Sequence, residues 1–258
     1  MKIVVAYKWA PNPQDASVGA DGVVDWGRAK PAVSEYDPVA VELGRVLADA
    51  TGAELIGISV GGADAGSPMA RKAALSRGLD RAVILADDAL AAGADTTRTG
   101  LALAALVQRI GDVDLVLTGD SSVDVGAQLV PAVLAGALGW PALTGVTAVS
   151  GAAGSLTVER GHDGGSQTLA LTGPAVLAVA ADAVQPRVPG MKDILAAGGK
   201  RPAEVLDTAA VPVPPGAVQV IATAPPELKA RRGQVIDAAD PAAAAAELVA
   251  ALRADAVI

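Results

Sequence analysis

The stretch "DLVLTGDSSVDVGAQLVPAVLAGALGWP", Asp114 to Pro141, decides the fold of this chain. It opens with aliphatic residues typical of a buried strand, passes a glycine, an aspartate and two serines, and continues as an apolar helix. Pro131 belongs in the first turn of that helix, because a proline deeper in a helix costs about 3 kcal/mol. We therefore expect the helix to begin near Gln128, after a loop at the carboxyl end of the strand.

Strand and helix patterns alternate along the chain up to this stretch. Strand patterns occupy residues 3–6, 53–62, 80–87 and 112–119, and helix patterns occupy residues 36–52, 67–78 and 95–111. Two helices have clear starts, because Asp37 and Ser67 can act as caps and each precedes a proline that fits a first turn. The alternation predicts an α/β fold, doubly wound, with a mainly parallel sheet covered on both faces.

The pattern changes after Pro141. Short strand patterns separated by Gly-rich turns occupy residues 141–151, 154–161, 166–173 and 174–182. They extend the sheet or build a small antiparallel layer, so the first domain is expected to span residues 1–184. Proline and glycine accumulate over residues 185–258, which we interpret as a loop and an extended arm ending in a helix.

The terminal helix has a clear start and an apolar stripe. Asp240 is its expected cap, and Pro241 its first residue. Leu248, Val249 and Leu252 form the stripe. The stripe packs either on another subunit or on the chain's own domain, and the sequence leaves both open.

The composition argues against several classes of function. The 258 residues are 52% hydrophobic with a net charge of -8, so the chain can fill a core but would repel a nucleic-acid backbone. It has no cysteine, and its one histidine, His162, lies in a tight-turn pattern and is expected to be structural. A cysteine nucleophile, a serine triad and a metal site are therefore not expected. The lack of a long apolar run or a signal-peptide pattern predicts a cytoplasmic protein without membrane insertion.

Three strand ends compete for a ligand, since ligands of doubly wound sheets lie beyond the carboxyl ends of the strands. These ends are residues 6–12, 59–62 and 118–128. The usual Gly-rich phosphate motifs do not follow the first strand, but the N–H groups of residues 119–130 could cradle a phosphate. Ser121, Ser122 and Asp124 could bind a ribose or order the loop, and Asp124 could equally be a turn or cap residue.

Five blocks of sequence carry a resemblance to a known family. They are "IVVAYK" (3–8), "YDPVAVE" (36–42), "DLVLTGDSSVD" with "AGALGWP" (114–141), "VERGHDGGSQTLALTGPAVLAV" (158–179) and "PRVPGMKDIL" (186–195). In this order they resemble the small, or beta, subunit of electron transfer flavoproteins over nearly the whole chain. The block at 158–179 is the most specific, because it fits the family's acidic di-glycine turn between strands. The resemblance implies a fold of the adenine-nucleotide-binding type.

The resemblance implies an electron carrier subunit, not an enzyme, and hence no catalytic residue. In this family the alpha subunit holds most contacts to an FAD, and the beta subunit closes against it and usually binds one AMP. Acyl-CoA dehydrogenases, as in fatty acid oxidation, or related dehydrogenases would deliver electrons. The electron transfer flavoprotein-quinone oxidoreductase would receive them. Residues 185–258 would recognise partners and pack on the alpha subunit.

The resemblance also assigns an AMP site. Its implied residues are Ala6, Tyr7, Lys8, Ser59, Val60, Gly61, Thr118, Gly119, Ser122, Val123, Asp124, Gly126, Ala127, Gln128, Leu129 and Val130. The loop departs from the family where Val125 and Gly126 replace acidic residues. A Gln-Thr-Gly is also replaced, by Leu129, Val130 and Pro131, which removes a hydroxyl and one N–H from the expected phosphate loop.

Two further surfaces are implied by the resemblance. Tyr36 matches an aromatic position that approaches the FAD, although it could instead be a helix-entry residue packed on the sheet. The implied partner-binding residues are Arg187, Met191, Lys192, Ile194 and Leu195. Met191 stands where the family commonly has an anchoring leucine, and its flexible thioether suits an apolar pocket.

Two other hypotheses remain open. Within the family, some electron-bifurcating relatives hold a second FAD in place of AMP. In another class, the chain would be a stand-alone nucleotide-binding, stress-type module that forms a homo-oligomer without a partner.

Overall fold

The computed structural model describes residues 1–91, 95–216, 218, 221, 227, 230, 233–238 and 240–258. Two compact units divide the chain, Met1–Thr223 and Ala224–Ile258. The first contains a large sheet and the helices that pack on it, and the second contains the C-terminal helix.

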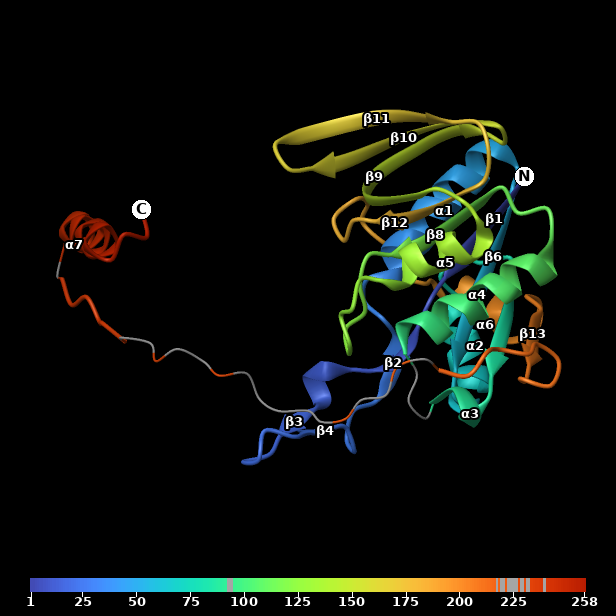
Figure 1. Ribbon diagram of the computed structural model, residues 1–258, viewed down its shortest axis with the longest axis horizontal. Helices are drawn as coiled ribbons and strands as arrows, with labels where there is room; N and C mark the ends of the chain where they lie inside the picture. The colour runs from blue at the N-terminus through green and yellow to red at the C-terminus, as the bar shows by residue number, and fades with distance from the viewer. Residues whose placement is uncertain are drawn as a thin grey trace. The chain divides into compact units, whose positions relative to one another are not determined.

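A nine-stranded sheet forms the centre of the first unit (Figure 1). Its strands are β1 (Lys2–Ala6), β6 (Glu54–Gly61), β7 (Arg81–Ala86), β8 (Leu115–Gly119), β9 (Ala142–Ala152), β10 (Ser155–His162), β11 (Gly165–Leu171), β12 (Ala175–Val179) and β13 (Ala203–Leu206). The strand order is β11-β10-β9-β12-β8-β1-β6-β7-β13. Neighbours run parallel except in the pairs β9–β10 and β10–β11. The expected doubly wound α/β fold with added antiparallel strands is confirmed.

Helices cover both faces of the sheet, because its central strands are apolar on both sides. They are α1 (Asp37–Thr51), α2 (Pro68–Leu75), α3 (Asp88–Ala91), α4 (Thr96–Ile110), α5 (Val130–Leu138) and α6 (Met191–Gly199). Residues of α1 and α2 share one core with Ile3 and Leu55, whereas residues of α4 and α5 share the other with Val4 and Ile56. Successive residues of a strand point to opposite faces, and this alternation assigns each to its core.

A short excursion of the chain separates β1 from α1. It contains β2 (Trp9–Pro11), η1 (Pro13–Asp15), β3 (Ser17–Val18), β4 (Val24–Asp25) and β5 (Pro31–Val33), and a similar short turn, η2 (Ala63–Gly66), follows β6. β2 pairs with β5, and β3 with β4. The Ser34 N–H then donates to the Lys8 carbonyl oxygen at 2.9 Å. The excursion therefore returns to the end of β1 just before α1 begins.

The most specific block of the sequence forms the hairpin β10–β11 and the strand β12. His162 pairs with Gly165, which leaves Asp163 and Gly164 as the turn. Gly164 has a φ of 85°, a conformation that favours glycine. The expected tight turn is confirmed, and His162 is exposed on it.

The chain stays with the first unit for longer than expected. Residues 191–199 form the helix α6, where the sequence indicated a loop, and α6 packs beside α2. β13 then extends the sheet by pairing in parallel with β7. The first unit continues to Thr223, whereas we expected the first domain to end at residue 184.

The C-terminal helix, α7 (Pro241–Ala254), begins as predicted. The Ala242 N–H donates to the Asp240 carboxylate at 3.3 Å, and Pro241 lies in the first turn. Leu248 and Val249 of the apolar stripe are exposed. Residues 217, 219–220, 222–226, 228–229, 231–232 and 239 of the expected arm lie outside the described residues.

Candidate functional site at the carboxyl edge of the sheet

The candidate site lies where β6, β1 and β8 end side by side (Figure 1). The strand order reverses at β1, because β6 and β7 follow on one side and β8 and β12 on the other. Ala6, the last residue of β1, pairs with Ile58 in β6 and with Thr118 in β8. The three strand ends that compete in the sequence therefore meet at one edge, where doubly wound folds bind ligands.

The residues of the implied AMP site gather at this edge. Ala6, Tyr7 and Lys8 end or follow β1; Ser59, Val60 and Gly61 end β6; Thr118 and Gly119 end β8; Ser122, Val123, Asp124, Gly126, Ala127 and Gln128 form the next loop; and Leu129 and Val130 begin α5. The helix starts two residues later than expected.

An ion pair joins the end of β1 to the loop after β8. The Lys8 Nζ lies 2.8 Å from Oδ1 and 2.7 Å from Oδ2 of Asp124. Burial of the Asp124 carboxyl acts to raise its pKa, but the hydrogen bond and charge of Lys8 act together with hydrogen bonds from Ser122 and the Val125 N–H to lower it. The pKa of Asp124 therefore lies below its ordinary value. Lys8 therefore ties this loop to the end of β1.

Asp37 connects the ends of β1 and β8. Its Oδ2 accepts a hydrogen bond from the Lys8 N–H at 2.7 Å, and its carboxylate also accepts from the Gly119 N–H. The residue is only 5% exposed, and burial raises the pKa of Asp37 to about 7, although these N–H groups and the Lys8 charge act in the opposite direction. The expected capping role is wrong, because Tyr36 is the N-cap residue and the Asp37 carboxyl is bonded to the strand ends.

Gly119 permits this close approach of α1 to β8. A Cβ at residue 119 would lie 2.7 Å from Oδ1 of Asp37 and 3.0 Å from Cβ of Tyr36. Tyr36 itself is half-buried at the N-cap position of α1. The tight contact makes glycine necessary at the end of β8.

The loop after β8 uses several of its own N–H groups. Val123 N–H donates to Ser34 Oγ at 3.3 Å, Val125 N–H to Asp124 Oδ1 at 2.9 Å, and Gly126 N–H to Ser122 Oγ at 3.3 Å. Among the described residues, no side chain caps α5. The first turn of α5 therefore keeps N–H groups without a side-chain cap, and such groups favour an anion.

Three buried hydroxyl groups lie close to the edge. Tyr7, Ser59 and Thr118 are 4%, 0% and 4% exposed. Their hydroxyl oxygens have no hydrogen-bond partner within the described ranges. Burial raises the pKa of Tyr7 above its ordinary value. These side chains are shielded from solvent, so contacts from β6 and β8 to a ligand would come mainly from their backbone.

The implied partner-binding residues divide into two groups. Arg187 forms a bidentate ion pair with Glu42 of α1, with Nε–Oε2 and Nη2–Oε1 distances of 2.6 and 2.8 Å. The side-chain hydrogen bond from Arg187 lowers the pKa of Glu42 despite burial. By contrast, Met191 and Leu195 are 72% and 68% exposed, Lys192 is exposed and Ile194 is half-buried. Arg187 therefore fixes the segment before α6, and α6 presents an apolar surface.

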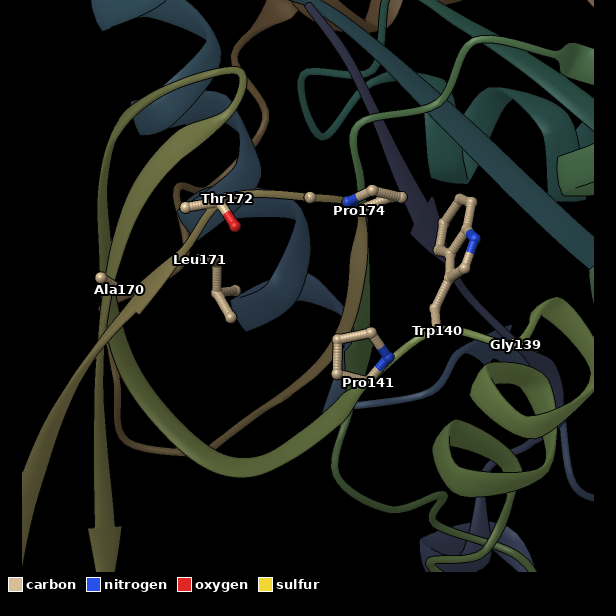
Figure 2. A pocket seen from close by; sticks show the side chains of 8 residues that line it. Gly139, Trp140, Pro141, Ala170, Leu171, Thr172 and Pro174 are labelled. Carbon is tan, nitrogen blue, oxygen red and sulfur yellow. The ribbon is translucent and has the colours of Figure 1, made fainter.

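A hollow of about 380 Å³ lies elsewhere, between the end of α5 and the connection from β11 to β12. Figure 2 shows the rings of Trp140, Pro141 and Pro174 around it. These residues precede β9 and β12, so the hollow lies at the amino ends of those strands. It is lined by uncharged residues and lies at the opposite edge from the candidate site.

The three strand ends were predictable from the sequence, but the hydrogen bonds and ion pairs that connect them were not. The sequence did not indicate the hydrogen bonds that Asp37 accepts, the hydrogen bond to the Ser34 hydroxyl or the ion pair between Glu42 and Arg187. The Asp37–Pro38 pair resembles an ordinary helix start, and the partners of Ser34 and Glu42 lie 89 and 145 residues away. No local pattern indicates these contacts.

The comparison with known families agrees with this architecture. Residues 21–211 match the family model described as the electron transfer flavoprotein domain. The chain belongs to the electron transfer flavoprotein family, which supports a role in electron transport. Within the described residues there is no helix with the length and apolar character to span a membrane, and no cluster of three or more acidic or histidine side chains placed to hold a metal ion.

Proposed function

We propose that this chain is the beta subunit of a heterodimeric electron transfer flavoprotein. With an alpha subunit it would hold an FAD that accepts electrons from acyl-CoA or related dehydrogenases and passes them toward a quinone-linked oxidoreductase. The observation that carries the proposal is the family match over residues 21–211, which spans both the site after β8 and the helix α6.

The carboxyl edge of the sheet would bind AMP in a structural role. The uncapped first turn of α5 supplies N–H groups for the phosphate, and Lys8 supplies a nearby positive charge. The ends of β1 and β6 supply backbone groups for the base and ribose. Bound AMP would tie the loop 120–129 to the strand ends and so stabilise the face that carries Tyr36.

The FAD would supply the one-electron chemistry. The contribution of this chain would be to enclose and orient it. The backbone and Cβ of Tyr36 lie against Gly119 at the end of β8, which places the residue at the start of α1 beside the candidate site. We propose that the ring of Tyr36 packs against the FAD across the subunit interface.

The helix α6 would dock the donor dehydrogenase. Met191 and Leu195 lie four residues apart and therefore share one side of the helix. The Arg187–Glu42 ion pair holds the preceding segment on α1, which gives α6 a fixed base. Exposed apolar side chains on a fixed element suit an anchor that fills a pocket on a partner.

The test is an electron-transfer assay on the chain co-expressed with its large subunit. We expect the purified complex to carry flavin, and its flavin absorbance to bleach when a reduced acyl-CoA dehydrogenase is added. A flavin-free protein, or a flavin that no dehydrogenase reduces, would count against the proposal.

A further inference from the structure

A hollow of about 340 Å³ lies beside the first turn of α1. Val33, Glu35 and Pro38 line one side, Arg77 lines another, and residues 185–189 close it. The ion pair between Arg187 and Glu42 fixes the closing segment, because it combines two side-chain hydrogen bonds with one from the Arg187 N–H at 3.2 Å. The hollow is therefore built from three separate parts of the chain.

Within the described part of the chain, Arg77 is a cation of this wall that has no ion-pair partner. Its Nε is buried without a hydrogen-bond partner among the residues that the structure describes, and no ion pair within 4 Å is found there. Burial lowers the pKa of Arg77, while the nearby charge of Asp37 acts the other way. A partly desolvated guanidinium without a partner is costly, and a carboxylate that binds it would remove that cost.

The acidic side chains of the chain itself do not supply this carboxylate. Glu42 is occupied by Arg187, and Asp37 accepts hydrogen bonds from the Lys8 and Gly119 N–H groups. Glu35 lines the same hollow but is exposed and forms no ion pair with Arg77 in the described part of the chain. Arg77 is therefore left without an acidic partner in the described ranges, and it is half-buried in the wall of the open hollow.

The hollow reaches the segment just before α6, because Pro189 lines it and the helix begins at Met191. Val188 lines the hollow and is 90% exposed, and Met191 and Leu195 follow on the helix. Arginine and methionine are enriched at protein interfaces, where an apolar centre is combined with charged groups that set partner choice. A partner that covers Val188 and Met191 would lie over the hollow that Arg77 lines.

We propose that Arg77 is a docking residue that binds a carboxylate side chain of the dehydrogenase seated on α6. This inference rests on the proposed function, and it names the chemistry of the partner's surface: an acidic side chain beside an apolar pocket. The planar guanidinium fork matches a carboxylate, which makes Arg77 a specificity element next to the apolar anchor.

The experiment compares Arg77→Met with Lys72→Met in the complex co-expressed with the large subunit. Both changes remove one positive charge, and Lys72 is an exposed residue of the neighbouring helix α2. The probe is an acyl-CoA dehydrogenase reduced by octanoyl-CoA, and the bleaching of the flavin is followed at two salt concentrations. We expect Arg77→Met to raise the apparent KM for the complex about 5- to 10-fold at low salt and to weaken its salt dependence. Lys72→Met should behave as the unaltered complex does.

Reduction by dithionite separates docking from effects on the flavin, because dithionite needs no protein contact. We expect it to be unchanged in Arg77→Met. The inference would be overturned if Arg77→Met left the apparent KM unchanged or raised it no more than Lys72→Met does. It would also be overturned if Arg77→Met altered the reaction with dithionite but not the apparent KM for the dehydrogenase. If Arg77→Met does not assemble with the large subunit, Arg77→Lys is measured instead. A rise in KM above that of the unaltered complex, smaller than about 5-fold, supports docking by Arg77, and no rise contradicts it. An unaltered complex that no dehydrogenase reduces would instead overturn the proposed function itself.

Discussion

At the residue scale, Asp37 links the chemistry of the edge to the stability of the fold. Its carboxyl has a pKa raised from 3.8 to about 7, mainly by burial. Because the pKa of the folded state lies above the unfolded value, the stabilising contribution is present in full below about pH 4. This contribution is lost as the pH rises through about 7. Between about pH 4 and pH 7 it amounts to about 4 kcal/mol in the free energy of unfolding.

The substitution Asp37→Asn tests this pH dependence. The asparagine oxygen can accept only one of the two N–H groups well, since its NH₂ faces the other, so the variant should be less stable at pH 4.5 by about 1–3 kcal/mol. The difference from the unaltered protein should shrink or reverse by pH 8. Urea unfolding across this pH range measures it, with the exposed Asp49→Asn on the same helix as control. A difference that grows with pH would contradict the assignment.

Gly119 is the second residue on which the edge depends. The substitution Gly119→Ala places a Cβ 2.7 Å from Asp37 Oδ1, and we expect a loss of about 1–3 kcal/mol in the free energy of unfolding. Gly136→Ala in α5 is the matched control, because a Cβ there meets nothing within 4 Å. It should stabilise the protein by up to about 1 kcal/mol, as alanine is the better helix former. Equal effects of the two changes would show that the contact is not tight.

At the element scale, the Lys8–Asp124 ion pair links the loop after β8 to the end of β1. We expect Asp124→Ala to lower the amount of AMP retained by the purified complex several-fold, because the loop would lose its link to β1. The control is Asp112→Asn, which removes one exposed acidic charge before β8. Asparagine also tolerates the left-handed φ of 50° at this residue. The AMP content is measured by chromatography after denaturation. Normal AMP content in Asp124→Ala would make Asp124 a turn residue only.

Met191 on the helix α6 is the predicted anchor for the dehydrogenase. The substitution Met191→Ala removes an exposed apolar side chain, so the free energy of unfolding and the flavin content should not change. Electron transfer from an acyl-CoA dehydrogenase should slow about tenfold or more, as expected for an interface anchor. Val46→Ala on α1 removes a comparably exposed apolar side chain and should leave transfer unchanged. If the stopped-flow traces of Met191→Ala and Val46→Ala coincide, Met191 is not an anchor for the dehydrogenase.

Elements with long, regular patterns were predictable from the sequence, and short or interrupted ones were not. The central strands and α4 follow clear apolar periods. β13 escaped notice because it has four residues between Pro202 and Asp207, and its place in the sheet depends on pairing with β7. Pro189 and Gly190 indicated a loop and obscured the start of α6.

The candidate site was predictable only in part, for a related reason. The fold rule places the ends of β1, β6 and β8 together, and each end is visible in the sequence. The bond between Lys8 and Asp124 joins residues 116 apart, and the bond from Lys8 to Asp37 turns a side chain away from its expected cap. Such contacts follow from the packed structure and have no local signal.

At the scale of the whole molecule, the two ligand-related surfaces belong to one unit. The edge that would bind AMP and the helix α6 that would dock a dehydrogenase both lie within residues 1–223. α1 connects them, because its first residue bonds the ends of β1 and β8 and its Glu42 holds Arg187. We therefore expect nucleotide binding and docking to depend on the same helix.

The most direct test of the account is the nucleotide content of the complex with the large subunit. The protein is co-expressed, purified and denatured, and the released nucleotides are separated and quantified against protein. The beta-subunit proposal predicts one FAD and one AMP per heterodimer. Two FAD without AMP would instead indicate an electron-bifurcating subunit. A chain that purifies alone, without a large subunit and without flavin, would contradict the account.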